Sequence, residues 1–472
     1  MALTDDEVST ITRLSQRHDA EIPELENLDR YYEGTQPLTY MHPEVLREVE
    51  DRIAPVIIFW PQMAVDSVEE RLRLEGFKTG DTGLDRELWR VWLANEMQIG
   101  FRMATVDSLV MRRSFVCVGT NEDDPDTPLV TPESPLEVYT DVDPRTRRVR
   151  DALRRVNDVD PAGAIVARYA TLYRPNETIW CHWAGSWVED GRDRHGLGVV
   201  PVVPLVNRPR LRGSTKTPRN MTVERMGRSD LDAIVPLSDA ANKLATDMVV
   251  AGEFVAIPLR ALFGVGPDSF KDEQGNPVSV LQALMGRMLT IPDEAVKAFE
   301  FAAAQLQNFT TAIGFLAQLV ASVSGLPPHY LGQSSDNPAS AEAIAGSEAR
   351  LATRAERKQD SFGVSAIRIA RLVRRFQTGE WDPDLALIKP DWRNVRTPTI
   401  SAMADAAVKL FQAGVIPKKQ TREGLGYDEP EIEAMEQEDE VEAQRSPTAA
   451  LVRGLADNSV TPAPGSADAN AG

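Results

Sequence analysis

The chain has few of the residues that carry most chemistry in proteins. Two cysteines, Cys117 and Cys181, and five histidines occur among its 472 residues. The cysteines stand in separate segments without a CxxC motif, so we expect two reduced, buried thiols. No two histidines stand four positions apart, which removes the usual helical pair of metal ligands. We therefore predict no metal site and no cofactor.

Motifs that bind nucleotides or activate a nucleophile are also missing. The sequence has no GxxxxGK[ST] loop, no GxGxxG after a strand, no HExxH and no GxSxG. The most enzyme-like cluster is Asp123, Asp124 and Asp126, whose carboxylates could hold Mg²⁺ for phosphodiester hydrolysis. A solvated turn punctuated by prolines explains the same residues, and we favour that interpretation. The prediction is therefore that the chain has no catalytic residues.

Net positive charge and long apolar runs are absent as well. The formal net charge is -19 and the isoelectric point about 4.9, whereas proteins that grip nucleic acid are normally basic. Such acidity opposes non-specific adhesion to DNA and to anionic membranes. The longest apolar stretch, 54–65, is broken by Pro55 and Pro61 and is shorter than the ~20 residues of a spanning helix. The N-terminus lacks the apolar core of a signal peptide, so we expect a cytoplasmic protein without membrane association.

The chain does contain ample apolar material for folded domains. Hydrophobic residues make up 42% and charged residues 26%, a globular composition with length for roughly two to four domains. Thr4-Asp5-Asp6-Glu7 matches a capping box and predicts a helix that continues to about Tyr32 and ends at Gly34. Apolar residues at three- and four-residue spacing predict further helices at 43–53, 62–72 and 85–113, the last with a break.

From Ser114 to about Asn207 the sequence changes to short runs rich in Val, Thr, Tyr and Trp. These runs predict strands at 114–119, 136–140, 164–173 and 199–206, with a turn at 143–146. An arginine cluster follows the turn and consists of Arg145, Arg147, Arg148, Arg150, Arg154 and Arg155. The cluster could contact DNA or an acidic partner, but a solvated strand face explains the same alternation and is favoured.

Three long helical segments come next, at about 229–255, 293–324 and 340–378. Pro236 is expected to kink the first helix. In the second, apolar residues alternate at three- and four-residue spacing, which predicts a helix that packs along another helix. The third, at ~1.5 Å per residue, would extend about 58 Å, and Gly346 and Gly363 predict a bend in it. A strand at 385–389, helices at 400–413, 418–423 and 431–444, and a disordered tail complete the chain.

The third long helix is basic, whereas the C-terminal helices are acidic. Residues 346–375 hold eight Arg or Lys and three acids, and residues 421–445 hold ten acids and two arginines. These opposite charges could pair between neighbouring copies of the chain or form independent solvated faces. The candidates for such contacts between copies are Arg350, Arg354, Arg357 and Lys358.

Several segments together resemble the portal proteins of tailed bacteriophages, in particular those of siphophages. They are Leu28-Asp29-Arg30-Tyr31-Tyr32-Glu33-Gly34, Val65 to Leu72 with Glu75-Gly76-Phe77, Pro201 to Arg208 leading into Gly227 to Leu231, Ser324 to Gly332, Asn337 to Ala341, Glu348, Arg354 to Lys358, and Gly414 to Pro417 with Gly424 to Tyr427. The resemblance covers about residues 25 to 430. Each motif alone is weak, but their order and spacing together are specific.

The resemblance implies an α+β, mainly helical portal fold with wing, two-helix stem, clip, long bent helix and helical crown. Carried onto this sequence, the parts are a wing at 1–228, stem helices at 229–256 and 293–325, a clip at 257–292, a tunnel loop, long bent helix and wing return at 326–394, a crown at 395–445 and a disordered tail at 446–472. The resemblance places the DNA-facing tunnel loop at Gln333, Ser334, Ser335, Asp336 and Asn337.

The function implied by the resemblance is a ring, usually of twelve subunits, at one capsid vertex. Double-stranded DNA would pass through it non-specifically, and terminase, head-completion or adaptor proteins, capsid and scaffolding proteins would be its partners. Its location would be the virion, and the host cytoplasm during assembly. Two alternatives stay open at this point: a metal-dependent phosphodiesterase or nuclease that uses the aspartate cluster, and another minor capsid structural protein.

Overall fold

A computed structural model of the chain describes residues 3–38, 55–210, 227–256, 260–263, 297–300, 306–333, 341–396, 400–427 and 429–445. The chain divides into two compact units, Met1–Val395 and Arg396–Gly472. Four of our predictions lie wholly or mostly outside the described residues: the helix at 43–53, the clip, the loop residues from Ser334 to Asn337, and the tail after 445.

The N-terminal segment forms two helices, α1 (Asp5–Asp19) and α2 (Ile22–Glu33). The capping box is confirmed, since the Thr4 hydroxyl accepts from the Glu7 amide and the Glu7 carboxylate accepts from the Thr4 amide. The single helix predicted as far as Tyr32 is wrong. Pro23 lacks an amide hydrogen and is tolerated only in a first turn, so a second helix begins there.

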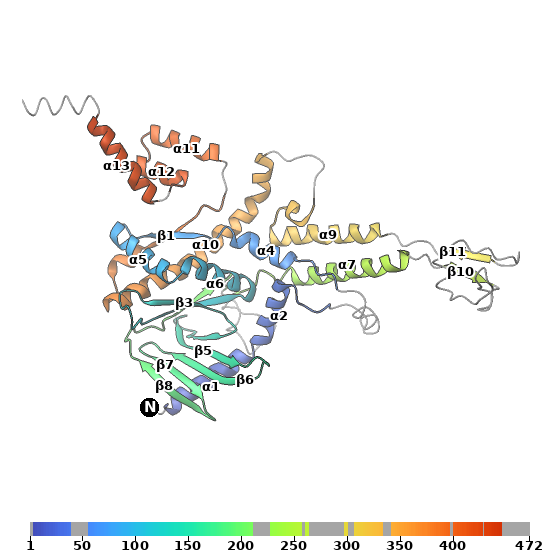
Figure 1. Cartoon of the computed structure of the whole chain (residues 1–472), viewed down its shortest axis with the longest axis horizontal. Coiled ribbons are helices and arrows are strands. Elements are labelled where there is room, and N and C mark those ends of the chain that lie inside the picture. Colours follow the sequence, from blue (N-terminus) through green and yellow to red (C-terminus); the bar gives the residue numbers. More distant parts are fainter. Residues whose placement is uncertain are drawn as a thin grey trace, which may run out of the picture. The chain divides into compact units, whose positions relative to one another are not determined.

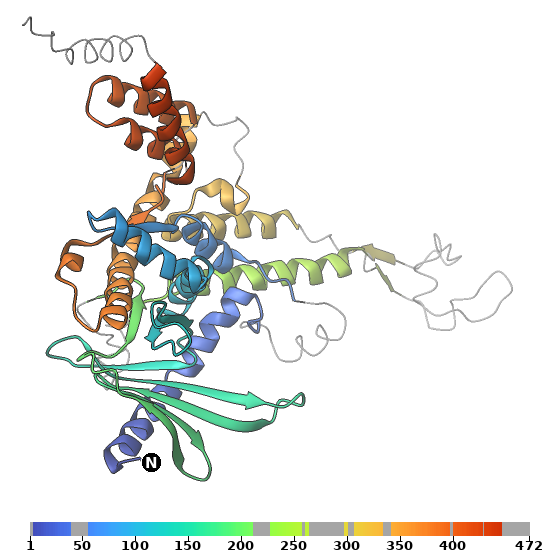
Figure 2. The same ribbon diagram turned by 60° about the vertical axis from the view of Figure 1, so that its left-hand side comes forward.

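A five-stranded antiparallel meander lies against α1 (Figures 1 and 2). Its strands, in spatial order, are β4 (Val138–Val142), β5 (Val149–Val159), β6 (Ile165–Tyr173), β7 (Thr178–Trp183) and β8 (Trp187–Asp193). Ile11 and Leu14 of α1 are fully buried in one cluster with Leu153, Leu172 and Ile179 of the sheet. The helix therefore closes one face of the meander.

A second sheet separates the meander from a layer of helices. It has the order β3 (Leu129–Glu133), β2 (Arg113–Gly119), β9 (Val202–Val206). Phe115 and Cys117 of β2 join one buried cluster with the meander, whereas Val116 and Val118 join the large helical cluster. The helices are α4 (Trp60–Glu69), α5 (Thr82–Ala94), α6 (Met97–Met111) and α10 (Ala341–Thr378). This arrangement confirms the α+β class.

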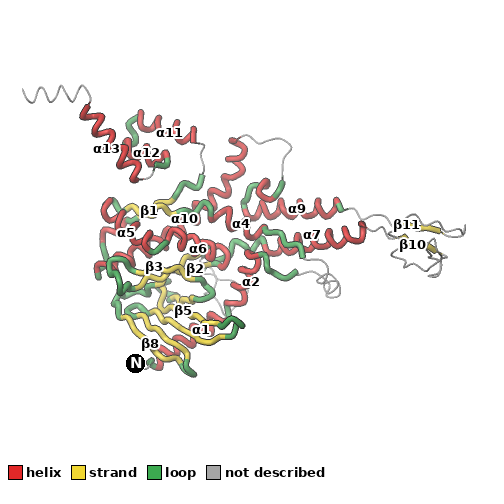
Figure 3. The backbone as a smooth tube through the Cα atoms, viewed as in Figure 1, coloured by secondary structure: helices red, strands yellow, loops and turns green. Residues whose placement is uncertain are grey.

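The long helix α10 is confirmed at 38 residues, and its axis turns along its length (Figure 3). Beside it, β1 (Leu74–Lys78) pairs antiparallel with β12 (Lys389–Trp392), a strand far away in the sequence. The strand predicted at 385–389 is wrong. A 3₁₀ turn, η4 (Pro383–Leu387), occupies most of that span because Asp382 accepts from the Asp384 amide and caps it.

The two predicted stem helices are shorter than expected. They are α7 (Val235–Ala256) and α9 (Gln307–Ser324). Pro236 lies in the first turn of α7 and does not kink it, because the amides of a first turn have no partner within the helix. The segment predicted to begin the second helix instead holds β11 (Lys297–Glu300), which pairs with β10 (Arg260–Phe263). The pairing provides hydrogen-bond partners for the backbone of β11. A 3₁₀ turn, η3 (Pro328–Leu331), follows α9.

The second unit contains α11 (Ile400–Gln412), α12 (Lys418–Leu425) and α13 (Glu429–Arg445), close to the three predicted helices. Ala407 and Ile432 are buried within it. The carboxylate of Asp439 accepts from Lys418 at 2.6 Å and from Arg422 at 2.7 Å, which ties α12 to α13.

Candidate functional site

The helices α7 and α9 lie side by side and run in opposite directions (Figure 1). Near the body of the unit, Ala241 and Ala245 of α7 and Ala317 and Val320 of α9 are buried, and the small side chains allow close approach. Farther from the body, Val249 of α7 is 37% exposed, and Phe315, midway along α9, is 59% exposed. The pair therefore presents apolar surface that the described residues do not cover.

Three polar side chains of α7 fix the pair to the N-terminal part of the chain. The Tyr31 hydroxyl donates to Asp239 at 2.8 Å. The Ile58 amide donates to Asn242 at 2.8 Å, and the Val56 amide to Thr246 at 3.2 Å. Two of these side chains accept hydrogen bonds from the backbone amides of an extended segment, which would otherwise have no partner once they are removed from water.

A buried polar cluster ties the approach to α7 onto α10 and β9. Asp230 accepts from Lys358 Nζ at 2.9 Å and from Arg354 Nη2 at 3.2 Å. Asn207, directly after β9, also accepts from Lys358 and donates to the Arg228 carbonyl at 2.7 Å. We call Asn207, Asp230, Arg354 and Lys358 the stem anchor. It joins three segments that are far apart in the sequence.

Burial works against all three charges of the stem anchor. It opposes ionisation of Asp230, but Lys358 and Arg354 outweigh it and lower the pKa of that carboxyl below its ordinary value. Burial lowers the pKa of Lys358 to about 8, although Asp230 counteracts the shift. For Arg354 and Lys358, which we expected to contact another copy, the partner is thus Asp230 of the same chain. For Arg350 and Arg357 the contact between copies stays a prediction.

The predicted tunnel loop has both flanks fixed to the end of α4. The Tyr330 hydroxyl, before the loop, donates to Glu348, after it, at 3.0 Å. Arg71 donates to Glu348 at 3.1 Å and to the Val395 carbonyl at 2.9 Å. Gln333, the loop residue that is described, donates to the Gly314 carbonyl of α9 at 3.5 Å. Sequence reasoning missed this cluster because its members share no local spacing.

The aspartate cluster lies in an exposed turn. The Asn121 side chain accepts from the amides of Asp123 and Asp124, and Asp124 accepts from the Asp126 amide. In the part of the chain that the structure describes, no group of three His, Cys, Asp or Glu side chains is placed to hold a metal ion. The arrangement supports the interpretation as a solvated turn.

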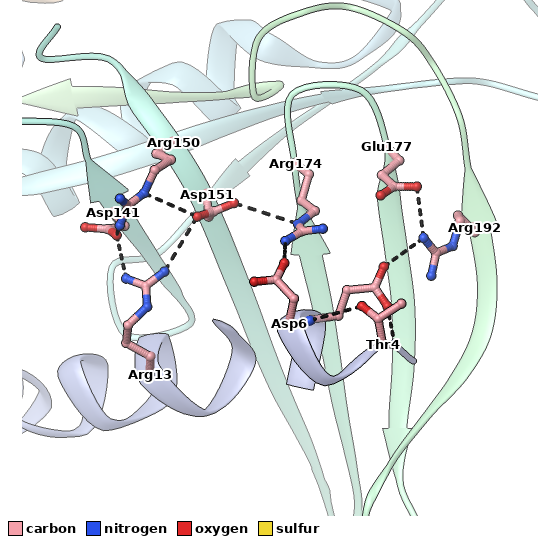
Figure 4. A network of polar contacts seen from close by, with 10 residues as sticks. Thr4, Asp6, Arg13, Asp141, Arg150, Asp151, Arg174, Glu177 and Arg192 are labelled. Atoms are coloured by element: carbon pink, nitrogen blue, oxygen red, sulfur yellow. Dashed lines mark hydrogen bonds and ion pairs between the residues drawn. The ribbon is translucent and has the colours of Figure 1, made fainter. Parts of the chain in front are cut away.

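The arginine cluster is divided by the structure. Arg150 pairs with Asp141, Arg154 with Glu133 at 2.9 Å and Arg155 with Asp19 at 2.7 Å. Figure 4 shows the first of these pairs within a network that holds α1 on the meander. The network also contains Arg13 with Asp141, Arg174 with Asp6 and Asp151, and Arg192 with Glu7 and Glu177. Half of the cluster therefore neutralises acids of its own chain.

Both cysteines are free and buried, as predicted. Burial raises the pKa of Cys181 to about 11 and that of Cys117 still further, which disfavours the reactive thiolate. None of the described helices has the length and apolar content needed to cross a membrane.

The chain is similar to known proteins over most of its length. The model of the family described as phage portal protein, SPP1 Gp6-like, matches residues 11–445. The portal protein of Mycobacterium phage D29 is 38% identical over 395 residues, which cover 81% of this chain and 79% of that protein. The portal protein of Mycobacterium phage L5 is 37% identical over 426 residues, covering 88% and 84%.

Two solved structures of gene transfer agent (GTA) particles are also similar. A chain of the native GTA virion has a TM-score of 0.40, and a chain of the neck of the empty GTA particle, computed with C6 symmetry, has a TM-score of 0.44. Each is 13% identical, and each match covers 86% of this chain and 94% of the other.

Proposed function

The chain belongs to the SPP1 Gp6-like family of phage portal proteins, and from this membership we propose that its copies form a closed ring around double-stranded DNA. The ring occupies one vertex of the capsid, and DNA enters through it during packaging and leaves through it during ejection. Twelve subunits is the number that the resemblance favours.

The observation that carries the proposal is the exposed apolar surface of the α7–α9 pair. A lone soluble subunit gains nothing from exposed Phe315 and Val323 on one of two long helices. Neighbouring helix pairs packed around a ring would bury these side chains at about 25 cal/mol per Å². The stem anchor supports this arrangement because it fixes the angle at which the pair leaves the body.

The charge of the chain suits a channel that must not retain its cargo. A net charge of -19 repels DNA overall, and the tunnel loop from Gln333 to Asn337 would offer hydrogen-bonding groups without cations. The proposed partners are terminase during packaging, head-completion or adaptor proteins afterwards, and capsid and scaffolding proteins at the vertex. Assembly would take place in the host cytoplasm.

Within this proposal the subunit performs no chemistry, and ATP hydrolysis belongs to the terminase. The turn that carries Asp123, Asp124 and Asp126 offers no observation in favour of the nuclease alternative. DNA cleavage by the purified wild-type protein in Mg²⁺, lost when the three residues are replaced by alanine, would contradict the proposal. A minor capsid role without a ring is distinguished by the assembly experiment.

The first prediction concerns ring assembly. Phe315→Asp places a charge on the exposed apolar surface of α9, whereas Gln318→Asp places the same charge at an exposed polar position of that helix. We expect the first variant to stay folded by circular dichroism and to lose rings by light scattering and negative-stain microscopy. The second variant should form rings as the wild type does. A wild-type protein that stays monomeric at high concentration would overturn the proposed function.

A further inference from the structure

A groove of about 870 Å³ lies between the β4–β5 turn, the segment that ends in β9, and the last turns of α10. Its floor is apolar and is formed mainly by valines and prolines. The described floor residues include Val142, Val149, Val199, Val202, Pro204 and Leu372. The groove is not part of the α7–α9 pair, the stem anchor or the tunnel loop, and the proposed channel function assigns it no role.

Five arginines line the groove above this floor: Arg147, Arg148, Arg210, Arg368 and Arg371. Among the residues that the structure describes, no carboxylate forms an ion pair with the four that come from the turn and α10. Partial burial and the neighbouring guanidinium of Arg148 lower the pKa of Arg368, as expected where like charges gather without an acid.

One carboxylate among the described lining residues, that of Asp143, also lines the groove, but it accepts hydrogen bonds within the β4–β5 turn. Asp143 accepts from the amide of Arg145 at 2.7 Å and from that of Thr146 at 2.8 Å. The turn also holds Arg147 at a φ of +59°, a conformation that costs a non-glycine residue about 1 kcal/mol or more. The backbone thus sustains strain where the two groove arginines leave the turn.

The groove arginines contrast with the rest of the arginine cluster. Arg150, Arg154 and Arg155 each pair with an acid of the same chain. Arg147 and Arg148, only a few positions away, instead line an apolar groove together with Arg368 and Arg371. In a chain with a net charge of -19, four guanidiniums that pair with no described carboxylate around one groove mark a site for an anionic group from outside the chain.

We propose that this groove binds an acidic peptide segment of a partner protein, whose apolar side chains enter the floor while its carboxylates meet the arginines. The apolar floor favours a peptide over a nucleic acid as the occupant, because a nucleic acid would present phosphates and flat bases. Of the described lining residues, Trp381 alone offers an aromatic ring, and Arg375 already lies over that ring at 5.9 Å. A base-stacking platform is therefore missing from the described lining, while a valine and proline floor suits aliphatic side chains.

The test uses the full-length protein and a short fluorescein-labelled peptide of alternating glutamate and leucine. Anisotropy should show saturable binding that weakens about tenfold or more in Arg148→Glu and in Arg368→Glu. Matched controls are Arg145→Glu on the same turn and Arg357→Glu on α10, since both are exposed and neither lines the groove. The controls should bind as the wild type does.

Three comparison probes decide between occupants. Peptides with glutamine for glutamate, or serine for leucine, should bind much more weakly, and equal binding of either would overturn the proposal. Single-stranded oligothymidylate that binds with the same sensitivity to Arg148→Glu would assign the groove to nucleic acid and overturn it. Light scattering on the same samples covers the remaining occupant, because oligomers that dissociate as peptide binds would show that a second copy fills the groove. Absence of binding also overturns the proposal.

Discussion

His18 is a fully buried histidine at the C-terminal end of α1. Its Nε2 lies 2.9 Å from the Pro135 carbonyl oxygen, which can only accept, so Nε2 carries the proton. Its Nδ1 lies 2.9 Å from Arg155 Nη2, which can only donate, so Nδ1 is the acceptor. The hydrogen bond from Arg155 requires the neutral ring, because a protonated Nδ1 cannot accept. Burial lowers the pKa of His18 to about 4, with Arg155 adding to the shift.

This geometry predicts a loss of stability in acid. Because the folded-state pKa lies below the ordinary value of 6.5, the contribution is complete above that pH and is lost as the pH falls towards 4. We expect His18 to account for about 2 kcal/mol of the fall in unfolding free energy. His18→Gln keeps a donor and an acceptor but does not titrate, so urea unfolding at pH 7 and pH 4.5 should differ less for it than for wild type.

His182→Gln is the control for that measurement, since His182 is an exposed histidine of β7 whose removal leaves α1 in place. If His18→Gln and wild type lost the same stability between the two pH values, the neutral buried ring would not be the cause.

At the residue scale the sequence reveals charges but not their partners. The excess of Arg and Lys on α10 was visible, yet the acid that matches Arg354 and Lys358 stands 124 and 128 positions away. The same holds for Arg150, Arg154 and Arg155, whose acids come from neighbouring strands and from α1. Spacing rules act within one turn or one strand pair, so distant pairing lies beyond them.

At the scale of elements, local chemistry predicted the helices well. The capping box at Thr4 and the glycine stops at Gly34 and Gly325 lie where the sequence indicates, and so do the helices of the second unit. Strands β7 and β8 were missed because their open face carries Trp180 and Val188 where a half-buried strand would show polar residues. The alternation that identifies a strand is weak in such a sequence.

The stem anchor gives a prediction at this scale, because it fixes the approach to α7 against α10. Lys358→Met leaves Asp230 buried with less compensation, which should destabilise the first unit by about 3–5 kcal/mol. Lys243→Met is the control, since the Lys243–Asp247 pair on α7 is partly exposed and its loss should cost about 0.5 kcal/mol or less. Denaturant unfolding followed by circular dichroism measures both, and equal effects would refute a structural role for the buried pair.

At the scale of the whole molecule, the sequence could not predict how the two sheets and the helices are layered, because the layers are formed by contacts between distant segments. Neither β1 nor its pairing with β12 was predicted, because those short strands are separated by most of the first unit. The two compact units meet at Val395, and the assignment of residues 395–445 to a crown stays a prediction.

This boundary leads to a prediction about truncation. The buried clusters of described residues that hold α10, β2 and the meander contain nothing beyond Val395. A chain of residues 1–395 should therefore fold, with a thermal midpoint within a few degrees of the full chain. A chain that ends at Thr378 loses buried Leu385 and Ile388 together with β12, and should aggregate. If the two truncations behaved alike in scattering and thermal melts, the first unit would not be self-contained.

The pairing of β1 with β12 also constrains the order of events during synthesis. Leu74 meets Trp392 in the register, so ribosomes must translate nearly the whole first unit before that sheet can close. Contacts between such distant residues are formed slowly, because a long chain must be ordered before any gain in free energy. A nascent subunit consequently spends most of its translation with an incomplete core, and chaperones have access to it throughout that interval.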